Sequence, residues 1–198
     1  MVNKRAVDIH LKSKWVEIYA DLFDQEVNFI DLVIPEIYSP SKYFAVIVAK
    51  RMTIDKIVTA MRREFDVNLF VEDLDKIITV NDRVADKNYV VLFEVNFEAN
   101  ENKDLKKISA STLDRKNIKG ITLLERLLLD VYCHSRYQGC HVLDANCGTM
   151  CSGSRLSVYS GGGVPCVSWN SLNSELNVSW VPVNNSGNNT SRAVIYST

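Results

Sequence analysis

The spacing of apolar residues separates stretches with a helical period from stretches with a strand period. Near the N-terminus, apolar side chains recur every three or four residues, as one face of an amphipathic helix requires. They are Trp15, Ile18, Tyr19, Leu22 and Phe23. Residues 7–11 alternate apolar and polar side chains, which predicts a short strand before that helix. A further apolar run, Phe29–Ile34, is stopped by Pro35.

The clearest unit is a strand–helix–strand module. Tyr43–Ala49 is a continuous apolar run of strand length, and Val67–Val71 is a second one. Between them, apolar side chains three or four residues apart form one helical face. They are Ile54, Ile57, Val58, Met61 and Phe65. We expect a short helical turn at residues 73–79 after the module.

Residues 89–97 show the strongest strand period. Apolar residues occupy every second position from Tyr89 to Phe97, and the polar residues Glu94 and Asn96 fall between them. This pattern predicts a half-buried strand with one face against a core. Charged residues dominate positions 98–107, which predicts a solvated connection to a short helix around Ser109–Asp114.

A long helix is predicted from about Leu123 to about Tyr137. Thr122 and Glu125 form a capping box, in which each side chain accepts a hydrogen bond from the backbone N–H of the other residue. An apolar stripe follows the box: Leu124, Leu127, Leu128 and Val131. Gly139 is suited to the left-handed residue that ends a helix.

The last third of the chain has the pattern of short strands joined by turns. Four segments alternate apolar with polar or small residues: Leu156/Val158, Val167/Trp169, Leu176/Val178/Trp180 and Val194/Tyr196. Gly161–Gly163 and Asn170–Ser174 are the predicted hairpin loops, and a longer polar loop spans Asn184–Ser191. The predicted fold class is α+β, with the N-terminal module and the long helix packed with a C-terminal antiparallel β-meander.

Charge divides the chain near residue 140. Residues 141–198 hold only four charged side chains: Asp144, Arg155, Glu175 and Arg192. We therefore expect a charge-rich mixed α/β region, 1–140, and a charge-poor antiparallel β region, 141–198, either as one continuous domain or as two. The hydrophobic fraction of 46% and charged fraction of 24% are those of ordinary soluble globular proteins.

The overall charge and the apolar runs limit the partners of the protein. A formal net charge of -1 provides no general attraction for nucleic acid or an anionic membrane. The longest apolar runs are much shorter than the roughly 20 residues that span a bilayer, so membrane insertion is not expected. Asp8 interrupts any apolar stretch that would serve as a signal peptide, and this favours the cytoplasm.

Five cysteines lie in the last third of the chain: Cys133, Cys140, Cys147, Cys151 and Cys166. An odd number favours free thiols in a reducing compartment. The alternative is an extracellular protein, since Asn177, Asn184 and Asn188 begin glycosylation sequons. In that case Cys140 or Cys147 would form a disulfide with Cys151 or Cys166.

Thiols and imidazoles are dense enough in this region to suggest zinc. Cys133, His134, Cys140, His141, Cys147 and Cys151 fall within nineteen residues. Zinc requires four such ligands in a tetrahedron, and the candidates are Cys140, His141, Cys147 and Cys151. No C-x-x-C pair is present, so the competing interpretation is buried, unreactive thiols.

Two further features suggest chemistry. In the loop Cys151–Arg155, backbone N–H groups and an arginine resemble an oxyanion site, which would make Cys151 a nucleophile, although the spacing differs from the phosphatase pattern. Arg155 and Arg192 are isolated cations that either pair with Asp144 or Glu175 or bind an anion, and the structural pair is favoured.

Trp169 and Trp180 are in phase with the apolar residues of their own strands. Core packing is therefore expected for both indoles, in preference to an aromatic platform for a sugar or a base.

Part of the sequence resembles a group of small uncharacterised bacterial proteins. The resemblance covers about residues 70–198 and rests on four segments: 120–130 (GITLLERLLLD), 151–155 (CSGSR), 164–169 (VPCVSW) and 176–180 (LNVSW). It implies a small bacterial protein and transfers no activity, cofactor, partner or site.

These observations favour a non-enzymatic binding or self-assembly protein, with a protein partner or a second copy as its ligand. One rival hypothesis is a thiol- or metal-dependent enzyme that uses the Cys147/Cys151/Arg155 loop on an anionic substrate. A third hypothesis is an exported surface or filament protein with disulfides between Cys140 and Cys166.

Overall fold

A computed structural model describes residues 4–157, 162–185 and 187–198. The helices are α1 (Lys4–Phe23), α2 (Ile54–Met61), α3 (Leu74–Ile77), the 3-10 turn η1 (Ala99–Glu101), α4 (Ala110–Arg115) and α5 (Leu123–Arg136). The strands are β1 (Tyr43–Val48), β2 (Asp66–Leu69), β3 (Ile78–Asn81), β4 (Tyr89–Glu94), β5 (Thr149–Met150), β6 (Ser154–Leu156), β7 (Gly163–Asn170), β8 (Glu175–Pro182) and β9 (Ile195–Ser197). The fold is α+β, as predicted.

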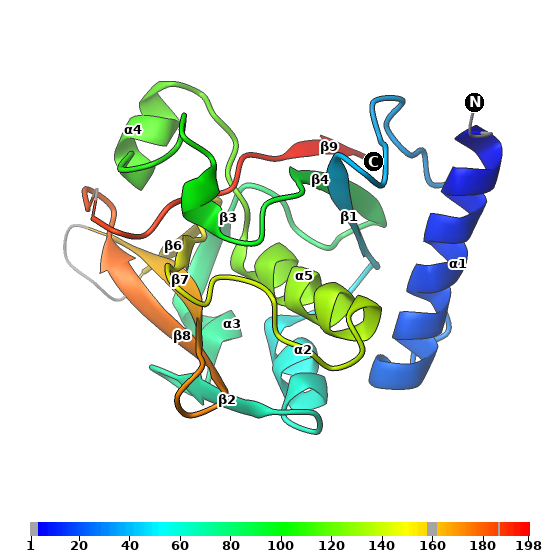
Figure 1. The fold of residues 1–198 in the computed structure, drawn as a ribbon, viewed down its shortest axis with the longest axis horizontal. Helices are drawn as coiled ribbons and strands as arrows, with labels where there is room; N and C mark the ends of the chain where they lie inside the picture. The colour runs from blue at the N-terminus through cyan, green and yellow to red at the C-terminus, as the bar shows by residue number, and fades with distance from the viewer. Residues whose placement is uncertain (1–3, 158–161, 186) are drawn as a thin grey trace.

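The strands form two sheets with α5 between them (Figure 1). The smaller sheet has the order β1-β4-β9, and the larger one has the order β2-β8-β7-β6-β3 with β5 paired to β7. Helix α5 contacts β1 of the first sheet and β7 of the second. Its N-terminal capping box is present as predicted, and its last carbonyls are followed by Gly139 at a φ of 85°. Both sheets therefore pack against this one helix.

Helix α1 covers the free edge of β1. Strand β1 pairs only with β4 among the described strands, so its other edge has backbone groups without strand partners. The Trp15 indole donates to the Ala45 carbonyl at 2.9 Å, and the Tyr19 hydroxyl donates to the Ile47 carbonyl at 3.0 Å and accepts from the Ala49 N–H at 2.8 Å. Two aromatic side chains thus form hydrogen bonds with backbone groups of an edge that would otherwise be open to pairing with another strand.

The predicted strand at residues 7–11 is wrong, because these residues belong to α1. Leu11 is buried together with Trp15, Ile18 and Tyr19, so it continues their helical phase. A two-residue alternation over five positions is too short to outweigh a helical face that extends through it.

Strand β4 differs from the half-buried pattern that was predicted. All residues from Tyr89 to Phe93 are buried, and the strand ends at Glu94. It is the central strand of its sheet, between β1 and β9, and side chains on both of its faces meet the core. Phe97, predicted to face inward, lies beyond the strand and is 38% exposed.

The strand–helix–strand order is confirmed, but its two strands join different sheets. Strand β1 pairs antiparallel with β4, whereas β2 runs parallel to β8. Strands β2 and β3, from the charge-rich region, flank the charge-poor strands β6, β7 and β8 in one sheet.

The antiparallel meander is confirmed for β6, β7 and β8. The last predicted strand does not continue it, because β9 pairs with β4 in the other sheet. Strand β5 was not predicted, and Val158 and Gly161 lie outside the described residues.

Among the described residues, no helix combines the length and the apolar character needed to cross a bilayer.

Two glycines allow the segment before α5 to approach the loop before β6. The Gly153 N–H donates to the Ile121 carbonyl at 2.9 Å. A Cβ atom at Gly153 would lie 2.6 Å from the Gly120 carbonyl oxygen, and one at Gly120 would lie 1.8 Å from Ser152 Oγ. Backbone atoms form the Gly153 contact, so local rearrangement cannot relieve it easily.

We predict that Gly153→Ala lowers the free energy of unfolding by about 2–3 kcal/mol, because the added methyl group collides with backbone. Gly187→Ala is the matched control, since its Cβ would meet the Asn185 side chain in an exposed loop. Urea denaturation of both variants measures the difference, and equal stabilities would contradict the prediction.

Candidate functional site

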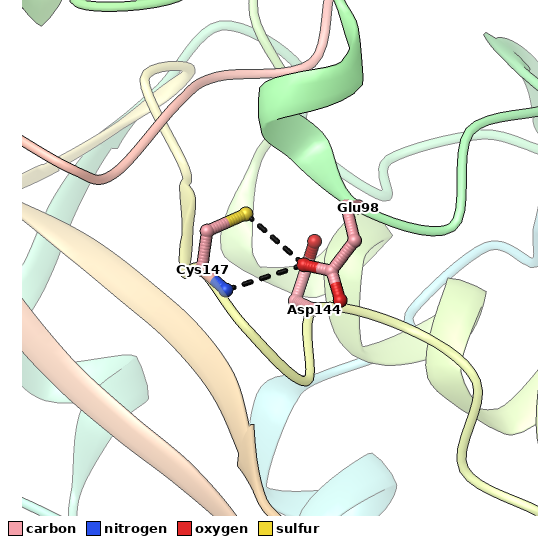
Figure 2. A group of neighbouring side chains, drawn as sticks. All are labelled: Glu98, Asp144 and Cys147. Carbon is pink, nitrogen blue, oxygen red and sulfur yellow. Dashed lines mark hydrogen bonds between the residues drawn. The ribbon is translucent and has the colours of Figure 1, made fainter.

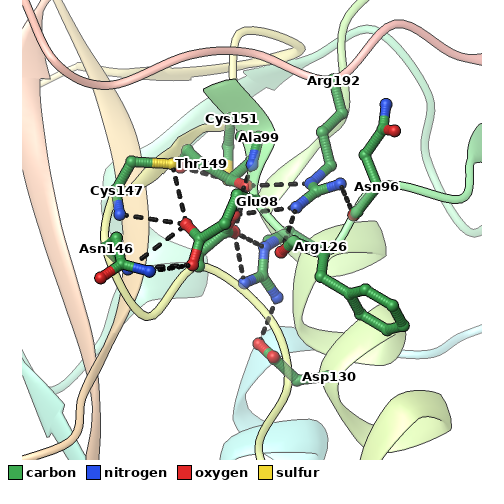
Figure 3. A network of polar contacts seen from close by, with 12 residues as sticks. Asn96, Glu98, Ala99, Arg126, Asp130, Asn146, Cys147, Thr149, Cys151 and Arg192 are labelled. Carbon is green, nitrogen blue, oxygen red and sulfur yellow. Dashed lines mark hydrogen bonds and ion pairs between the residues drawn. The ribbon is translucent and has the colours of Figure 1, made fainter. Parts of the chain in front are cut away.

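A single buried carboxylate, that of Asp144, accepts hydrogen bonds from four other residues. Figure 3 labels these donors, which are Ala99, Arg126, Thr149 and Arg192. Its Oδ2 atom accepts from Arg126 Nε at 3.2 Å, from Arg126 Nη2 at 2.7 Å and from the Thr149 hydroxyl. Its Oδ1 atom accepts from Arg192 Nη2 at 2.8 Å and from the Ala99 N–H at 2.9 Å. All the acceptor positions of this carboxylate are therefore in use.

The donors come from segments that are far apart in the sequence. Arg126 lies on α5, Thr149 on β5 and Ala99 at the start of η1, and Arg192 lies just before β9. The segment of Arg192 is placed beside α5 because the Ile121 N–H donates to the Arg192 carbonyl at 3.0 Å. The predicted structural pair of Arg192 with Asp144 is thus confirmed.

Arg192 makes three further hydrogen bonds besides the one to Asp144. Its Nη1 atom donates to the Asn96 carbonyl at 2.6 Å, its Nη2 atom also donates to the Phe97 carbonyl at 3.2 Å, and its Nε atom donates to the Thr149 hydroxyl at 3.1 Å. The side chain is buried, so these bonds fix it. Four of its five N–H donors are therefore already used by protein acceptors.

Asp130 adds a second buried carboxylate to the network. It lies one turn after Arg126 on α5 and accepts from Arg126 Nη1. Burial raises the pKa of Asp130 to about 6 against the opposing charge of Arg126. Burial would also raise the pKa of Asp144, but Arg192 and Arg126 outweigh it and hold that pKa below its ordinary value.

Glu98, Asp144 and Cys147 form a group that resembles a metal site (Figure 2). Within the described part of the chain, it is the one group of three potential metal-ligand residues whose ligand atoms lie within 4.8 Å of one another. The Glu98 carboxylate, however, accepts from the Asn146 N–H at 3.0 Å, from Asn146 Nδ2 at 2.9 Å and from the Cys147 N–H and thiol, each at 3.2 Å.

This group does not fit a cation. Both carboxylates are already saturated by protein donors, and Arg126 and Arg192 place two positive charges beside Asp144. Burial raises the pKa of Cys147 to about 11, so the deprotonation that metal binding requires is more costly here than at an exposed thiol. We interpret the group as part of the polar core.

The four candidate zinc ligands do not form one site in this structure. Cys147 and Cys151 are buried, near the Asp144 network, whereas Cys140 and His141 line an open hollow at the end of α5. The sequence predicted one site because these four residues are close along the chain. None of the five cysteines is paired with another in this structure, so the disulfides of the alternative, extracellular hypothesis are not formed.

Cys151 has the opposite of the environment that a nucleophile needs. Its side chain is completely buried, and burial raises its pKa well above the ordinary value. Arg155 points elsewhere, with its Nη2 atom 2.6 Å from the Asp114 carboxylate of α4. The expected partners of Arg155, Asp144 and Glu175, were therefore wrong.

The open hollow at the end of α5, which we call the imidazole hollow, is about 610 Å³ in volume and includes Phe65, His134, Cys140, His141 and Trp169. The His141 ring stacks on Trp169 at 3.5 Å between centroids, and Phe65 meets it edge-on at 4.2 Å. Trp169 also packs against the core, as expected, but one part of it belongs to this hollow. His134 was not among the predicted site residues.

The largest hollow described lies between α1 and α5, and we call it the α1/α5 groove. Its volume is about 700 Å³. From α1 it takes residues that recur every three or four positions, Ala6, His10, Lys14 and Glu17. Tyr38, Tyr132 and Arg136 complete it from the loop before β1 and from α5. The sequence showed only the apolar face of α1, because the groove exists through the packing of two distant helices.

No protein-family model matches the chain, and comparisons with the curated proteins and with the solved structures return no match. The function must therefore be inferred from the geometry.

Replacing the central carboxylate tests the Asp144 network. We predict that Asp144→Asn lowers the free energy of unfolding by about 3–5 kcal/mol, because two buried guanidinium groups lose their common anion. Asp114→Asn is the matched control, since it removes the partner of Arg155 at a carboxylate that is 55% exposed, and it should cost less than about 1 kcal/mol. Chemical denaturation compares them, and similar losses would contradict this account.

The raised pKa of Asp130 predicts that the free energy of unfolding depends on pH. Because its folded-state pKa is above its ordinary value of 3.8, the folded protein holds a proton between about pH 4 and pH 6 that the unfolded chain has lost. Stability from this group is therefore present below about pH 4 and is lost as the pH rises through 6. Relative to Asp130→Asn, the wild type should lose about 2–3 kcal/mol between pH 4 and pH 7. A difference that stays constant or grows with pH would contradict this.

Proposed function

We propose that this protein is a non-enzymatic binding protein that holds an amphipathic anion in the α1/α5 groove. The single observation that supports the proposal is a groove of about 700 Å³ with an aromatic floor and cations at its rim. Pockets that enclose small molecules typically measure about 300–1,000 Å³ and combine an apolar lining with a few polar groups.

The floor of the groove is apolar and rigid. Tyr132 is 6% exposed, and its ring stacks on Trp15 at 5.6 Å between centroids with 12° between the planes. Leu11 and Tyr38 are buried beside it. Such a floor is held in place by the core beneath it, so it would offer a ligand a preformed surface at little entropic cost.

The rim of the groove favours negative charge. Lys14 forms an ion pair with Glu17 at 3.6 Å, so the net positive charge of the rim comes from Arg136. Arg136 donates to the Tyr132 hydroxyl at 2.9 Å, which directs its guanidinium along the floor while leaving further N–H donors for a ligand. A guanidinium suits a carboxylate or phosphate group because it can make two parallel hydrogen bonds.

The rival hypothesis of a thiol enzyme finds less support. Burial raises the pKa of Cys133, Cys147, Cys151 and Cys166, and each of these thiols is buried. A thiol that is neither accessible nor deprotonated does not attack a substrate. A binding role requires neither property.

The fluorescent amphipathic anion 8-anilinonaphthalene-1-sulfonate is a direct probe of the groove. We predict saturable binding that weakens about tenfold in Arg136→Gln, because one charge-assisted hydrogen bond is lost. Arg62→Gln, which removes an exposed cation paired with Glu72, is the matched control and should leave the affinity unchanged.

A bulky substitution gives a second readout that preserves the core. Ala6→Trp fills the groove from an exposed position on α1 and should abolish probe binding while the unfolding curve stays unchanged. Equal binding by the wild type, Arg136→Gln and Ala6→Trp would contradict the proposed function, as would equal affinity for a cationic dye of similar size.

A further inference from the structure

The imidazole hollow has a feature that the fold does not explain. The Nε2 atom of His141 is buried and has no hydrogen-bond partner among the described residues. Most buried polar atoms in proteins have a partner, and an ordered water or an ion is one kind of partner. This nitrogen is therefore not used by a protein group.

The chain folds back so that two imidazoles lie close together at this place, with a cysteine lining the same hollow. His134 lies in the last turn of α5, and Gln138 and Gly139 follow in the left-handed region, with φ values of 55° and 85°. This reversal places the Nε2 atom of His134 over Gly139, where a Cβ atom would lie 3.7 Å from it. Cys140 and His141 come immediately after the reversal.

The two imidazoles are spaced as ligands of one ion would be. Their ring centroids are 5.3 Å apart. Two imidazoles bound tetrahedrally to one Zn²⁺, with Zn–N of about 2.0–2.1 Å, have centroids about 5 Å apart. Stacking on Trp169 fixes the orientation of His141, as the groups around a metal site commonly do.

From this geometry we propose that His134 and His141, together with Cys140, bind a divalent transition-metal ion of the zinc class. Nitrogen and sulfur donors select such ions over Mg²⁺ or Ca²⁺. Glu64 and Asp66 line the same hollow, and either carboxylate can serve as a fourth ligand.

Cys140 must move to complete the site. Its exposed side chain does not bring a third ligand atom within 4.8 Å of the two imidazoles in this structure, but an exposed side chain on a turn rotates at little cost. As the sulfur–metal bond forms, the thiol proton passes to solvent, so binding releases a proton.

Titration calorimetry with Zn²⁺ tests the site through the three histidines of the chain. We predict that His134→Ala and His141→Ala each weaken Zn²⁺ binding at least tenfold, whereas His10→Ala on α1 changes it less than twofold. Cys140→Ser should reduce the number of protons released per Zn²⁺. Cys147→Ser is a further control, and loss of binding in that variant alone would place the ion at Glu98 and overturn the proposal.

A measurement on the wild type keeps the proposal testable if a histidine variant does not fold. Paramagnetic Co²⁺ should broaden the ring-proton NMR signals of His134 and His141 at substoichiometric amounts and leave those of His10 sharp. Equal broadening of all three histidines, or no broadening, would overturn the proposal. The imidazole hollow shares no lining residue with the α1/α5 groove, so neither result bears on the proposed function.

Discussion

The arrangement of this protein depends on the carboxylate of Asp144, which has to be buried and yet fully satisfied. A lone buried carboxylate is costly, and this one is stabilised by Arg126, Arg192, Thr149 and the Ala99 N–H. Each donor belongs to a different segment, so the network forms only when α5, β5, η1 and the segment before β9 are all in place. It thereby specifies how the two sheets meet around α5 as well as contributing stability.

The same reasoning separates structural groups from groups available for binding. Glu98, Asp144 and Cys147 look like metal ligands by distance, but protein donors already occupy both carboxylates. Arg136 and His141 differ because each lines an open hollow and has polar atoms that no protein group uses. Counting the hydrogen bonds already made by each side chain is therefore more informative here than proximity between side chains.

Local patterns in the sequence predicted the helices and strands better than they predicted which strands and side chains pair with each other. The capping box at Thr122 predicted the start of α5 because its interactions span three residues, and the runs that became β1, β7 and β8 were found for a similar reason. The pairing of β9 with β4, the coverage of both faces of β4 and the partner of Arg155 depend on contacts across the chain. The four candidate zinc ligands were predicted as one cluster because they are close in the sequence, but they do not form one site in the structure. They are Cys140, His141, Cys147 and Cys151. Of the site itself, charge predicted that Arg192 pairs with Asp144 or Glu175, and the structure pairs it with Asp144, whereas the same reasoning was wrong for Arg155.

The most direct measurement of the central claim is hydrogen exchange at the Ala99 amide, which donates to Asp144 Oδ1 at 2.9 Å. If the network holds the segments together, this amide exchanges only through global unfolding, and its free energy of exchange equals that from denaturant unfolding. Exchange at a much lower free energy, like that of a surface loop, would show that the segment opens independently and would contradict the account.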